Sequence, residues 1–571
     1  MSTWNGPYRA AADLDRLLGD PRDPLNPHGY AAMAGRDAAE TYPDALAAEV
    51  SPSLRDAFLP GGRPADETMM IIRAVGRRDI TIMPATMFSI TAATCVLLAG
   101  SAAQQDWVRR LLAGGGSIGF ALSEAPHGSD LLGNDCIAEP TPGGFALTGE
   151  KWLVGTGAKC EAMLVVARTG VRGPSSFSCF LVDGDLLRRG EPQRPTGMRG
   201  IDFTGFRFDG TRLPRSALVG EVDHGLETAM KAMQVVRVTG TAANLVCADT
   251  GLRLALDFAT SHKVGGRALI NHQQPQADVA TAFTALLAAD AVALSAARAL
   301  HTLPGAQSLW SSVAKKVLTD LSGEVLDRCG DVLGTRSVLR DGQFAAFDVV
   351  RRDNAVARHI DTGPTANTRL AAAQLSQIVA AGLGPAGVDL SGTFAVDVKL
   401  PPLRLSELDM STRGRDEVTA GLPAIIGLAR AVLHGDEHAG RTRKAMSSID
   451  AALTMVREDT QVSLAQRASG LFDLAERFCY LHAAASCVYL WWYNRHLPLA
   501  GLRPGSSSWL WPVLELLLDR AHQRHRRLAP DAVSAVIPLL RRLHSGGRLF
   551  SVVPLPLAES STVEGIVPWP V

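Results

Sequence analysis

The segment Phe120-Ala-Leu-Ser-Glu-Ala-Pro-His-Gly-Ser-Asp130 carries more architectural information than any other part of the sequence. A short apolar strand that holds Ser123 runs into a turn with Pro126, Gly128 and a second hydroxyl residue, Ser129. Side-chain hydroxyls and several backbone N–H groups therefore lie at one strand end. Such an arrangement suits an anionic or electron-rich heterocyclic ligand, and an ordinary polar turn is the alternative.

The sequence on either side of this segment predicts a mainly α protein with a central β domain. Short apolar runs alternate with Gly, Pro and Asp turns around it, which is typical of a small and mostly antiparallel β domain. Helical periodicity precedes and follows that domain. We expect five parts: an N-terminal helical domain (1–117), the β domain (118–224), a helical bundle (225–380), a Gly/Pro-rich linker (381–402) and a C-terminal helical extension (403–571).

The composition excludes several classes of protein. The 571 residues include 57 Lys and Arg and 57 Asp and Glu, so the net charge is zero, which argues against non-specific nucleic-acid binding. The apolar run 86–100 is interrupted by Ser and Thr, so we expect no membrane span, and residues 1–20 show no secretory signal. The eight cysteines are scattered without a CxxC pair. We therefore expect reduced thiols, a cytoplasmic location and no metal site.

Three further motifs have ordinary structural interpretations. Residues 114–119 match G-x-G-x-x-G, but a helix precedes them, which favours a helix stop over a phosphate loop. The aromatic run 489–493 is typical of a core or an inter-domain seam, and a ligand wall is the alternative. His522 and His525 lie among arginines on an expected helix, 520–527. A solvated basic face that can meet an acidic partner or a phosphate is favoured there over a metal site.

The segment 120–130 resembles the strand end that opens the β domain of the acyl-CoA dehydrogenase family. The resemblance continues in order through 147–157, the strand 206–214, a long helix with Arg237, and the pair His272-Gln273. It ends with the turn 333–336 and the loop 359–369. The resemblance spans roughly residues 10–380, and the C-terminal extension is similar in position to that of the very-long-chain branch.

This resemblance implies an FAD at the junction of the β domain and the second helical domain. It places Ser123 near flavin N5, Gly128 and Ser129 near the pyrophosphate or the thioester arm, and Leu153, Val154 and Gly155 on the second flavin-contacting strand. Other positions that reach FAD, some of them across a dimer interface, are His262, His272, Gln273, Asp331 and Gly334. A homodimer or a homotetramer follows from the same resemblance.

The site departs from the family at the catalytic base. The aligned glutamate position holds Thr362, and a threonine hydroxyl is too weak a base to replace a carboxylate. A second branch keeps its glutamate just before the helix arginine, where this chain has Val236. Asp361 is one residue early and is either a displaced base or a turn-capping residue. The backbone N–H of Thr362 is a candidate donor to the thioester carbonyl, and Arg237 and Gly363 are candidate substrate contacts.

Three positions that the resemblance assigns to FAD contacts also differ from the family pattern. Leu153-Val-Gly155 replaces Trp-x-Thr, and His262 replaces an arginine that meets the pyrophosphate.

Three functions follow from these observations. The first is a flavin oxidoreductase that acts on an acyl thioester of CoA or of a carrier protein, with an altered base and an electron acceptor that the sequence does not name. In that case the arginines at 520–527 are a candidate docking face for an acidic carrier. The second is a flavin monooxygenase such as an N-hydroxylase, which needs no glutamate because reduced flavin and O₂ do the chemistry. The third is a non-redox member that only binds a ligand or a partner.

Overall fold

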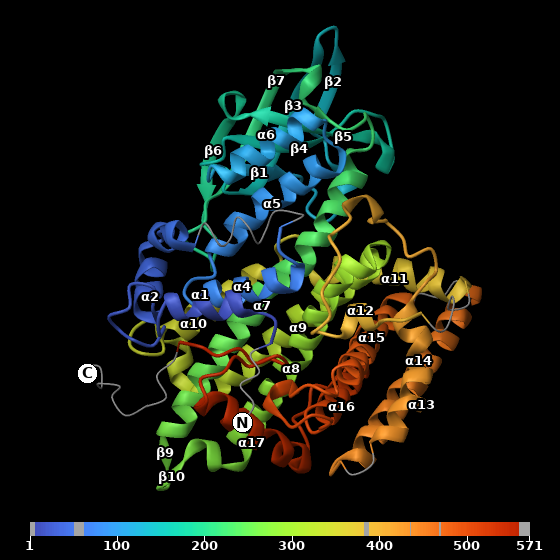
Figure 1. Cartoon of the computed structure of the whole chain (residues 1–571). Helices are drawn as coiled ribbons and strands as arrows, with labels where there is room; N and C mark the ends of the chain where they lie inside the picture. Colours follow the sequence, from blue (N-terminus) through green and yellow to red (C-terminus); the bar gives the residue numbers. More distant parts are fainter. Residues whose placement is uncertain (1–5, 51–61, 382–387, 434–435, 467–469, 559–571) are drawn as a thin grey trace.

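The computed structural model describes residues 6–50, 62–381, 388–433, 436–466 and 470–558. Helices form the lower part of the molecule, and a β sheet forms its upper end (Figure 1). The N-terminal helices are α1 (Arg9–Leu17), α2 (Tyr30–Ala39), α4 (Ala65–Gly76), α5 (Ile82–Ala99) and α6 (Ala102–Ala113).

Helix α6 begins and ends where its sequence signals predict. Ser101 and Gln104 form a reciprocal capping box at its start, and Gly114 follows its last residue. The Gly116 N–H then closes on the Leu111 carbonyl at 2.9 Å. The interpretation of residues 114–119 as a helix stop is therefore confirmed.

The β domain is one mostly antiparallel sheet with the strand order β6-β7-β3-β2-β4-β5-β8, and β1 pairs in parallel with β4. The long strands β3 and β7 run side by side from Gly144↔Pro214 to Gly155↔Phe203. The strands are β1 (Ile118–Ala121), β2 (Ile137–Thr141), β3 (Gly144–Gly155), β4 (Ala162–Arg168), β5 (Phe177–Asp183), β6 (Arg188–Gln193), β7 (Phe203–Pro214) and β8 (Leu218–Val219).

The helical bundle is built around three long helices, α7 (Gly225–Ser261), α8 (Gln273–Thr302) and α9 (Gln307–Leu333). The hairpin β9 (Lys263–Val264) and β10 (Arg267–Ala268) follows α7, and α10 (Ala345–Ala357) and α11 (Pro364–Ala381) complete the bundle. By length and composition α8 could cross a membrane, but its apolar window is entirely buried between other helices. The sequence interpretation did not single this helix out.

Within the segment that the sequence predicts as a linker, Leu390 and residues 393–396 are buried against the bundle, while both flanks are exposed. The segment contains the short helix α12 (Ser391–Phe394), and Phe394 is fully buried. Arg298 on α8 donates to the carbonyl oxygens of Thr393 and Ala395 at 2.9 and 2.6 Å. Residues 382–387 lie outside the described residues.

The C-terminal extension packs against one side of the bundle (Figure 1). Its helices are α13 (Glu417–Val432), α14 (Ala439–Gln466), α15 (Leu471–Tyr493), α16 (Leu510–Ala521) and α17 (Pro530–Ser545). Tyr489 and Trp491 are 2% exposed, and Tyr489 stacks on Phe394 with ring centroids 5.0 Å apart. The prediction that the aromatic run is core is confirmed.

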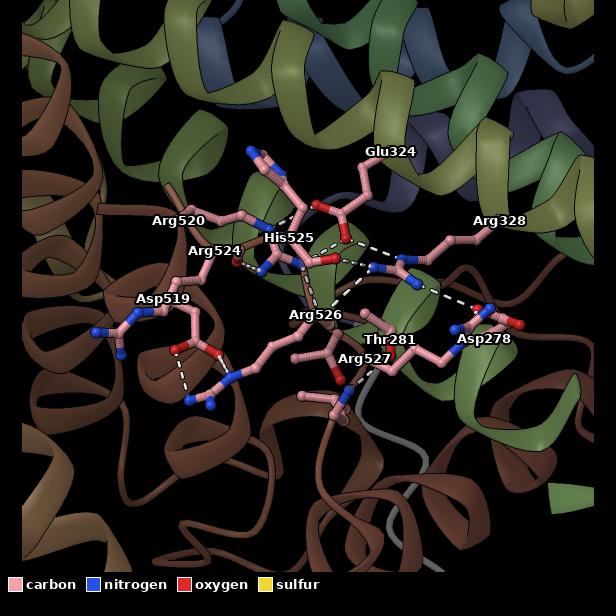
Figure 2. A network of polar contacts seen from close by, with 12 residues as sticks. Asp278, Thr281, Glu324, Arg328, Asp519, Arg520, Arg524, His525, Arg526 and Arg527 are labelled. Atoms are coloured by element: carbon pink, nitrogen blue, oxygen red, sulfur yellow. Dashed lines mark hydrogen bonds and ion pairs between the residues drawn. The ribbon is translucent and has the colours of Figure 1, made fainter. Parts of the chain in front are cut away.

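The basic segment 520–527 leaves the expected helix early, but residues 522–527 are exposed, as the prediction of a solvated basic face requires. Helix α16 ends at Ala521, and His522 to Ala529 follow without helical structure. Figure 2 shows that three of its arginines make internal ion pairs, Arg520 with Glu324, Arg526 with Asp519, and Arg527 with Asp278. Arg520 and Arg527 attach the extension to α9 and α8 through Glu324 and Asp278, each of which also pairs with Arg328, whereas Arg526 pairs within the extension. Carrier docking at the exposed part of this face stays a prediction.

Candidate active site

Arg237 and Asp361 form a buried ion pair between the middle of the bundle and the loop that precedes α11. The Arg237 Nε atom donates to Asp361 Oδ2 at 2.9 Å, and the two side chains are 1% and 9% exposed. Asp361 holds a left-handed backbone conformation with φ of 70°, which aspartate tolerates better than most residues. This conformation turns the carboxylate toward α7.

Thr362 makes its hydrogen bonds within the loop and the start of α11. Its hydroxyl lies 3.2 Å from both Asp361 Oδ2 and Asn367 Oδ1. Its backbone N–H donates to the Ile360 carbonyl at 3.1 Å, and Asn367 donates to the carbonyl oxygens of Thr362 and Gly363. Thr362 therefore has no free backbone donor in this conformation, so the expected polarisation of a substrate carbonyl by its N–H would require the bond to Ile360 to open. Asp361 is the better placed of the two residues.

Two residues of α9 complete this polar cluster, and the sequence interpretation missed both. Arg237 Nη1 donates to Ser311 Oγ at 3.3 Å, and Lys315 Nζ donates to the Ala357 carbonyl at 2.8 Å. Burial lowers the pKa of Lys315 to about 8, Asp361 works against that shift, and Arg237 adds to it. Ser311 and Lys315 lie four residues apart on one face of α9, but this helix carries many other polar residues, so no signal in the sequence singles them out.

A second group of predicted residues lies where β1 and β3 end. Trp152 donates its backbone N–H to the Ser123 carbonyl at 3.0 Å, which joins the two strand ends. The large apolar side chains of Trp152 and Leu153 are 39% and 41% exposed beside them. Within the described part of the chain the Ser123 hydroxyl forms no hydrogen bond. This platform offers an apolar surface and a free hydroxyl, which suits an aromatic ligand. Gly128 and Ser129 lie exposed in the turn beyond it.

Gly155 packs directly under an aromatic ring of α5. A Cβ atom at this position would lie 1.9 Å from the ring of Phe88, so no side chain fits there unless the ring moves. Phe88 also makes an edge contact with Phe203. The replacement of threonine by glycine at 155 is thus matched by a ring that fills the space, and a side-chain hydroxyl from this position is not available to a ligand.

The remaining predicted cofactor residues gather at the other end of α7. His262 stacks on Phe258 with ring centroids 4.7 Å apart, and the Arg336 guanidinium covers the same ring at 4.6 Å. His272 Nε2 lies 3.1 Å from the Val264 carbonyl oxygen in the adjacent hairpin. Gln273, Asp331 and Gly334 are exposed around this group, and Gly334 has φ of 59°.

The two groups are far apart within one chain. Helix α7 has 37 residues and separates them, so it places roughly 55 Å between its ends. Figure 1 shows the β9–β10 hairpin at the end of the molecule opposite the sheet. Within the described residues, no three His, Cys, Asp or Glu side chains are close enough to hold a metal ion.

Two family models match the chain. The acyl-CoA dehydrogenase middle domain matches residues 119–211, and the acyl-CoA dehydrogenase C-terminal domain matches residues 223–372. These matches include the strand-end platform, the Arg237–Asp361 pair and the residues at the far end of α7. The C-terminal extension lies beyond them.

Curated relatives share modest identity with the chain. Mitochondrial isovaleryl-CoA dehydrogenase of Arabidopsis thaliana is 27% identical over 203 residues, which is 35% of this chain and 50% of the relative. The caffeyl-CoA reductase-Etf complex subunit CarC of Acetobacterium woodii is 23% identical over 250 residues, 43% of this chain and 66% of that subunit. The chain thus spans between half and two thirds of these relatives.

Solved structures with the same fold include butyryl-CoA dehydrogenase from Megasphaera elsdenii and the prolyl acyl carrier protein oxidase AnaB. Both superpose with a TM-score of 0.58 at 18% identity and cover 64% of this chain, and they are matched over 96% and 98% of their own lengths. The agreement extends from the sheet through the helical bundle. With the two matched domains and the curated relatives, it shows that residues 119–372 resemble the acyl-CoA dehydrogenase middle and C-terminal domains and that the chain has the fold of these structures.

Proposed function

We propose that this protein is an FAD-dependent oxidoreductase that acts on an acyl thioester, with Asp361 as the proton acceptor in place of the usual glutamate. The observation that carries the proposal is the 2.9 Å ion pair between Asp361 and Arg237. It holds a carboxylate on the loop that normally supplies the base. Asp361 Oδ2 takes the contacts from Arg237 and Thr362, while within the described chain Oδ1 has no hydrogen-bond partner. Oδ1 is therefore the atom available to take a proton.

The residues at the strand end fit a flavin. Ser123 offers an unpaired hydroxyl, and Trp152 and Leu153 offer an exposed apolar surface against which a planar ring can pack. Bound there, FAD would supply the acceptor for a hydride. Phe88 fills the space over Gly155, so backbone groups and Ser123 take over the polar contacts.

The positions of the predicted cofactor residues at the far end of α7 support an FAD site that is shared between two copies of the chain. His262, Gln273, Asp331 and Gly334 lie too far from Ser123 to hold the same FAD within one chain, because α7 places roughly 55 Å between its ends. A partner that brings its own far end to this sheet would complete the site, so we propose a homodimer or a dimer of dimers. The exposed apolar side chains of Val264, Val338 and Leu339 at that end support a covered surface.

The names of the relatives support a thioester substrate. Isovaleryl-CoA dehydrogenase and butyryl-CoA dehydrogenase are named for CoA thioesters, and AnaB is named for a prolyl group on a carrier protein. CarC is a subunit of a complex named for an electron-transferring flavoprotein, which makes such a flavoprotein the first acceptor to test. All eight cysteines are free and buried, which supports a reducing compartment such as the cytoplasm.

The visible spectrum of the purified protein tests this function. We expect a yellow protein whose absorbance near 450 nm bleaches when thioesters of different chain lengths are added without oxygen. A colourless protein that takes up no FAD would favour a non-redox role. Flavin that resists every thioester, yet consumes oxygen when a flavin reductase is supplied, would favour a monooxygenase.

A further inference from the structure

A groove runs along the first turns of α7 and is closed on its outer side by the C-terminal extension. It consists of two cavities of about 580 and 400 Å³ that share Glu227, Lys231 and Ser406. One end reaches Leu98 and Ala99 at the end of α5, and the other end reaches Thr412. The bundle supplies the inner wall through α7 and the turn Pro304–Ala306.

The outer wall is fixed in place by hydrogen bonds to two helices of the bundle. Gln234 on α7 donates its side-chain amide to the Asp409 carbonyl at 2.9 Å. Gln374 on α11 donates to the Met410 carbonyl at 3.3 Å and accepts from the Thr412 N–H at 2.9 Å. These hydrogen bonds therefore hold residues 409–412 in a fixed position along the groove.

Buried polar atoms without a partner lie at the groove and on the two helix faces that carry the candidate active site. Within the described chain, Thr412 Oγ1, which lines the groove, and Gln234 Oε1 are buried without a hydrogen-bond partner. The same holds for Arg237 Nη2 and for both amide atoms of Gln307. Gln234 lies one turn before Arg237 on α7, and Gln307 lies one turn before Ser311 on α9, so each shares a helix face with a residue of the candidate active site.

Buried polar groups are normally satisfied, so these donors and acceptors call for a ligand or water that carries both. The charges indicate which kind of ligand fits. The groove is lined by the carboxylates of Glu221, Glu227, Glu407, Asp409 and Glu417. Its three cations are Lys231, Arg413 and Arg415, and two of them are paired with groove carboxylates, Lys231 with Glu227 and Arg413 with Asp409. A polyphosphate does not suit this balance, whereas an uncharged chain with amide groups does.

We propose that residues 405–413 of the extension form one wall of the channel that delivers the amide-bearing arm of an acyl thioester to Arg237 and Asp361, with Thr412 as a polar contact to that arm. This inference rests on the proposed function. The pantetheine arm is common to CoA and to carrier proteins, and the charged nucleotide or the carrier would remain outside the groove. The extension thereby becomes part of the substrate site.

Binding measurements on the purified full-length protein test this proposal. The probes are butyryl-pantetheine, butyryl-CoA and a butyryl-loaded acyl carrier protein, and the readout is the dissociation constant from calorimetry. Ser406→Trp blocks the point that the two cavities share, and Thr412→Val removes the unpaired hydroxyl without changing the side-chain shape. The controls are Ser534→Trp, exposed on α17, and Thr460→Val, a buried threonine of α14 whose hydroxyl bonds to its own helix at Val456.

We expect Ser406→Trp to raise the dissociation constant of butyryl-pantetheine by at least about tenfold, and Thr412→Val to raise it by about threefold to tenfold. Both controls should bind butyryl-pantetheine with a dissociation constant within about twofold of the wild-type value. Tighter binding of the loaded carrier than of butyryl-CoA would identify the carrier as the source of the arm, and the reverse would identify CoA. Equal affinities for Ser406→Trp and Ser534→Trp would overturn the channel and leave the proposed function standing. If Ser406→Trp weakens the binding of butyryl-pantetheine but no thioester bleaches the flavin, the channel proposal would stand and the proposed function would be overturned. A wild-type protein that binds no arm would overturn both.

Discussion

Lys315 on α9 and Ala357 at the end of α10 are joined by a hydrogen bond of 2.8 Å between the lysine Nζ atom and the alanine carbonyl oxygen. This contact fixes the end of α10 four residues before Asp361, so it positions the loop that carries the candidate base. Lys315 is 3% exposed, and the negative charge of Asp361 opposes the lowering of its pKa by burial and by Arg237.

Lys315→Met should flatten the pH dependence of stability in alkaline solution. The folded-state pKa of about 8 lies below the unfolded value of 10.5, so between these values the unfolded chain holds the proton and the folded chain does not. The stability of the wild type therefore rises with pH in that window, by up to about 1.4 kcal/mol per pH unit, and the penalty is fully present below it. Urea unfolding at about pH 8 and about pH 9.5 measures this. Lys399→Met, at an exposed position, is the control, and equal slopes for both variants would contradict the expectation.

Asp361→Asn should slow flavin reduction by about 10²–10⁴-fold, because the amide cannot take a proton and no longer balances Arg237. Thr362→Val should slow it by less than about tenfold, since its hydroxyl contacts only Asp361 and Asn367. Stopped-flow bleaching under anaerobic conditions separates the two variants. If Thr362→Val proved the slower one, the assignment of the base to Asp361 would fail.

Local patterns predict the frame of this protein well and the contacts inside its site poorly. The capping box at Ser101, the alternating strands and the long apolar helices depend on residues close in sequence, and the structure has them where expected. The pairing of Arg237 with Asp361 joins positions 124 residues apart, and no local signal encodes it. The basic segment is exposed at 522–527 as predicted, but the ion pairs of Arg520 with Glu324 and of Arg527 with Asp278 join positions about 200 and 250 residues apart, so no local signal encodes them.

Arg520→Gln should loosen the extension. Arg520 is buried, and its Nε donates to Glu324 Oε2 at 2.7 Å, so its loss leaves a largely buried carboxylate with only Arg328 beside it. We expect a destabilisation of about 3 kcal/mol and faster hydrogen exchange in α16 and α17. Arg526→Gln in the same segment removes an ion pair of an arginine that is 66% exposed, and should change stability by less than about 1 kcal/mol. Similar exchange rates in both variants would show that Arg520 does not anchor the extension.

Asp353→Asn should stabilise the protein increasingly as the pH rises. Burial is the main cause that raises the pKa of Asp353 to about 8, with Asp79 and Asp37 adding to it, while the Met198 N–H that it accepts works against the shift. Between the unfolded value of 3.8 and about 8, the folded state holds a proton that the unfolded state has lost. Wild-type stability therefore falls through this window by up to about 1.4 kcal/mol per pH unit. Asparagine keeps the acceptor for Met198 and has no proton to lose. Unfolding curves should show that the free energy of unfolding of the variant, relative to that of the wild type, is larger at about pH 8 than at about pH 5. The same difference at both pH values would contradict this prediction.

Gly155→Ala should destabilise the protein only while Phe88 is present. The new Cβ would lie 1.9 Å from the Phe88 ring, which is held in turn by its edge contact with Phe203. Forcing the ring aside is an overpacking change, for which we expect a loss of about 1–3 kcal/mol. In a Phe88→Ala background the same substitution finds open space and should cost less than about 0.5 kcal/mol, so the double-mutant cycle yields a coupling energy of about 1–2 kcal/mol. The flavin content of each variant adds a second readout. If Phe88 has replaced a side-chain contact at position 155, Phe88→Ala combined with Gly155→Thr should hold FAD more tightly than Phe88→Ala alone. Additive effects on stability, together with unchanged flavin content, would show that the two positions are independent.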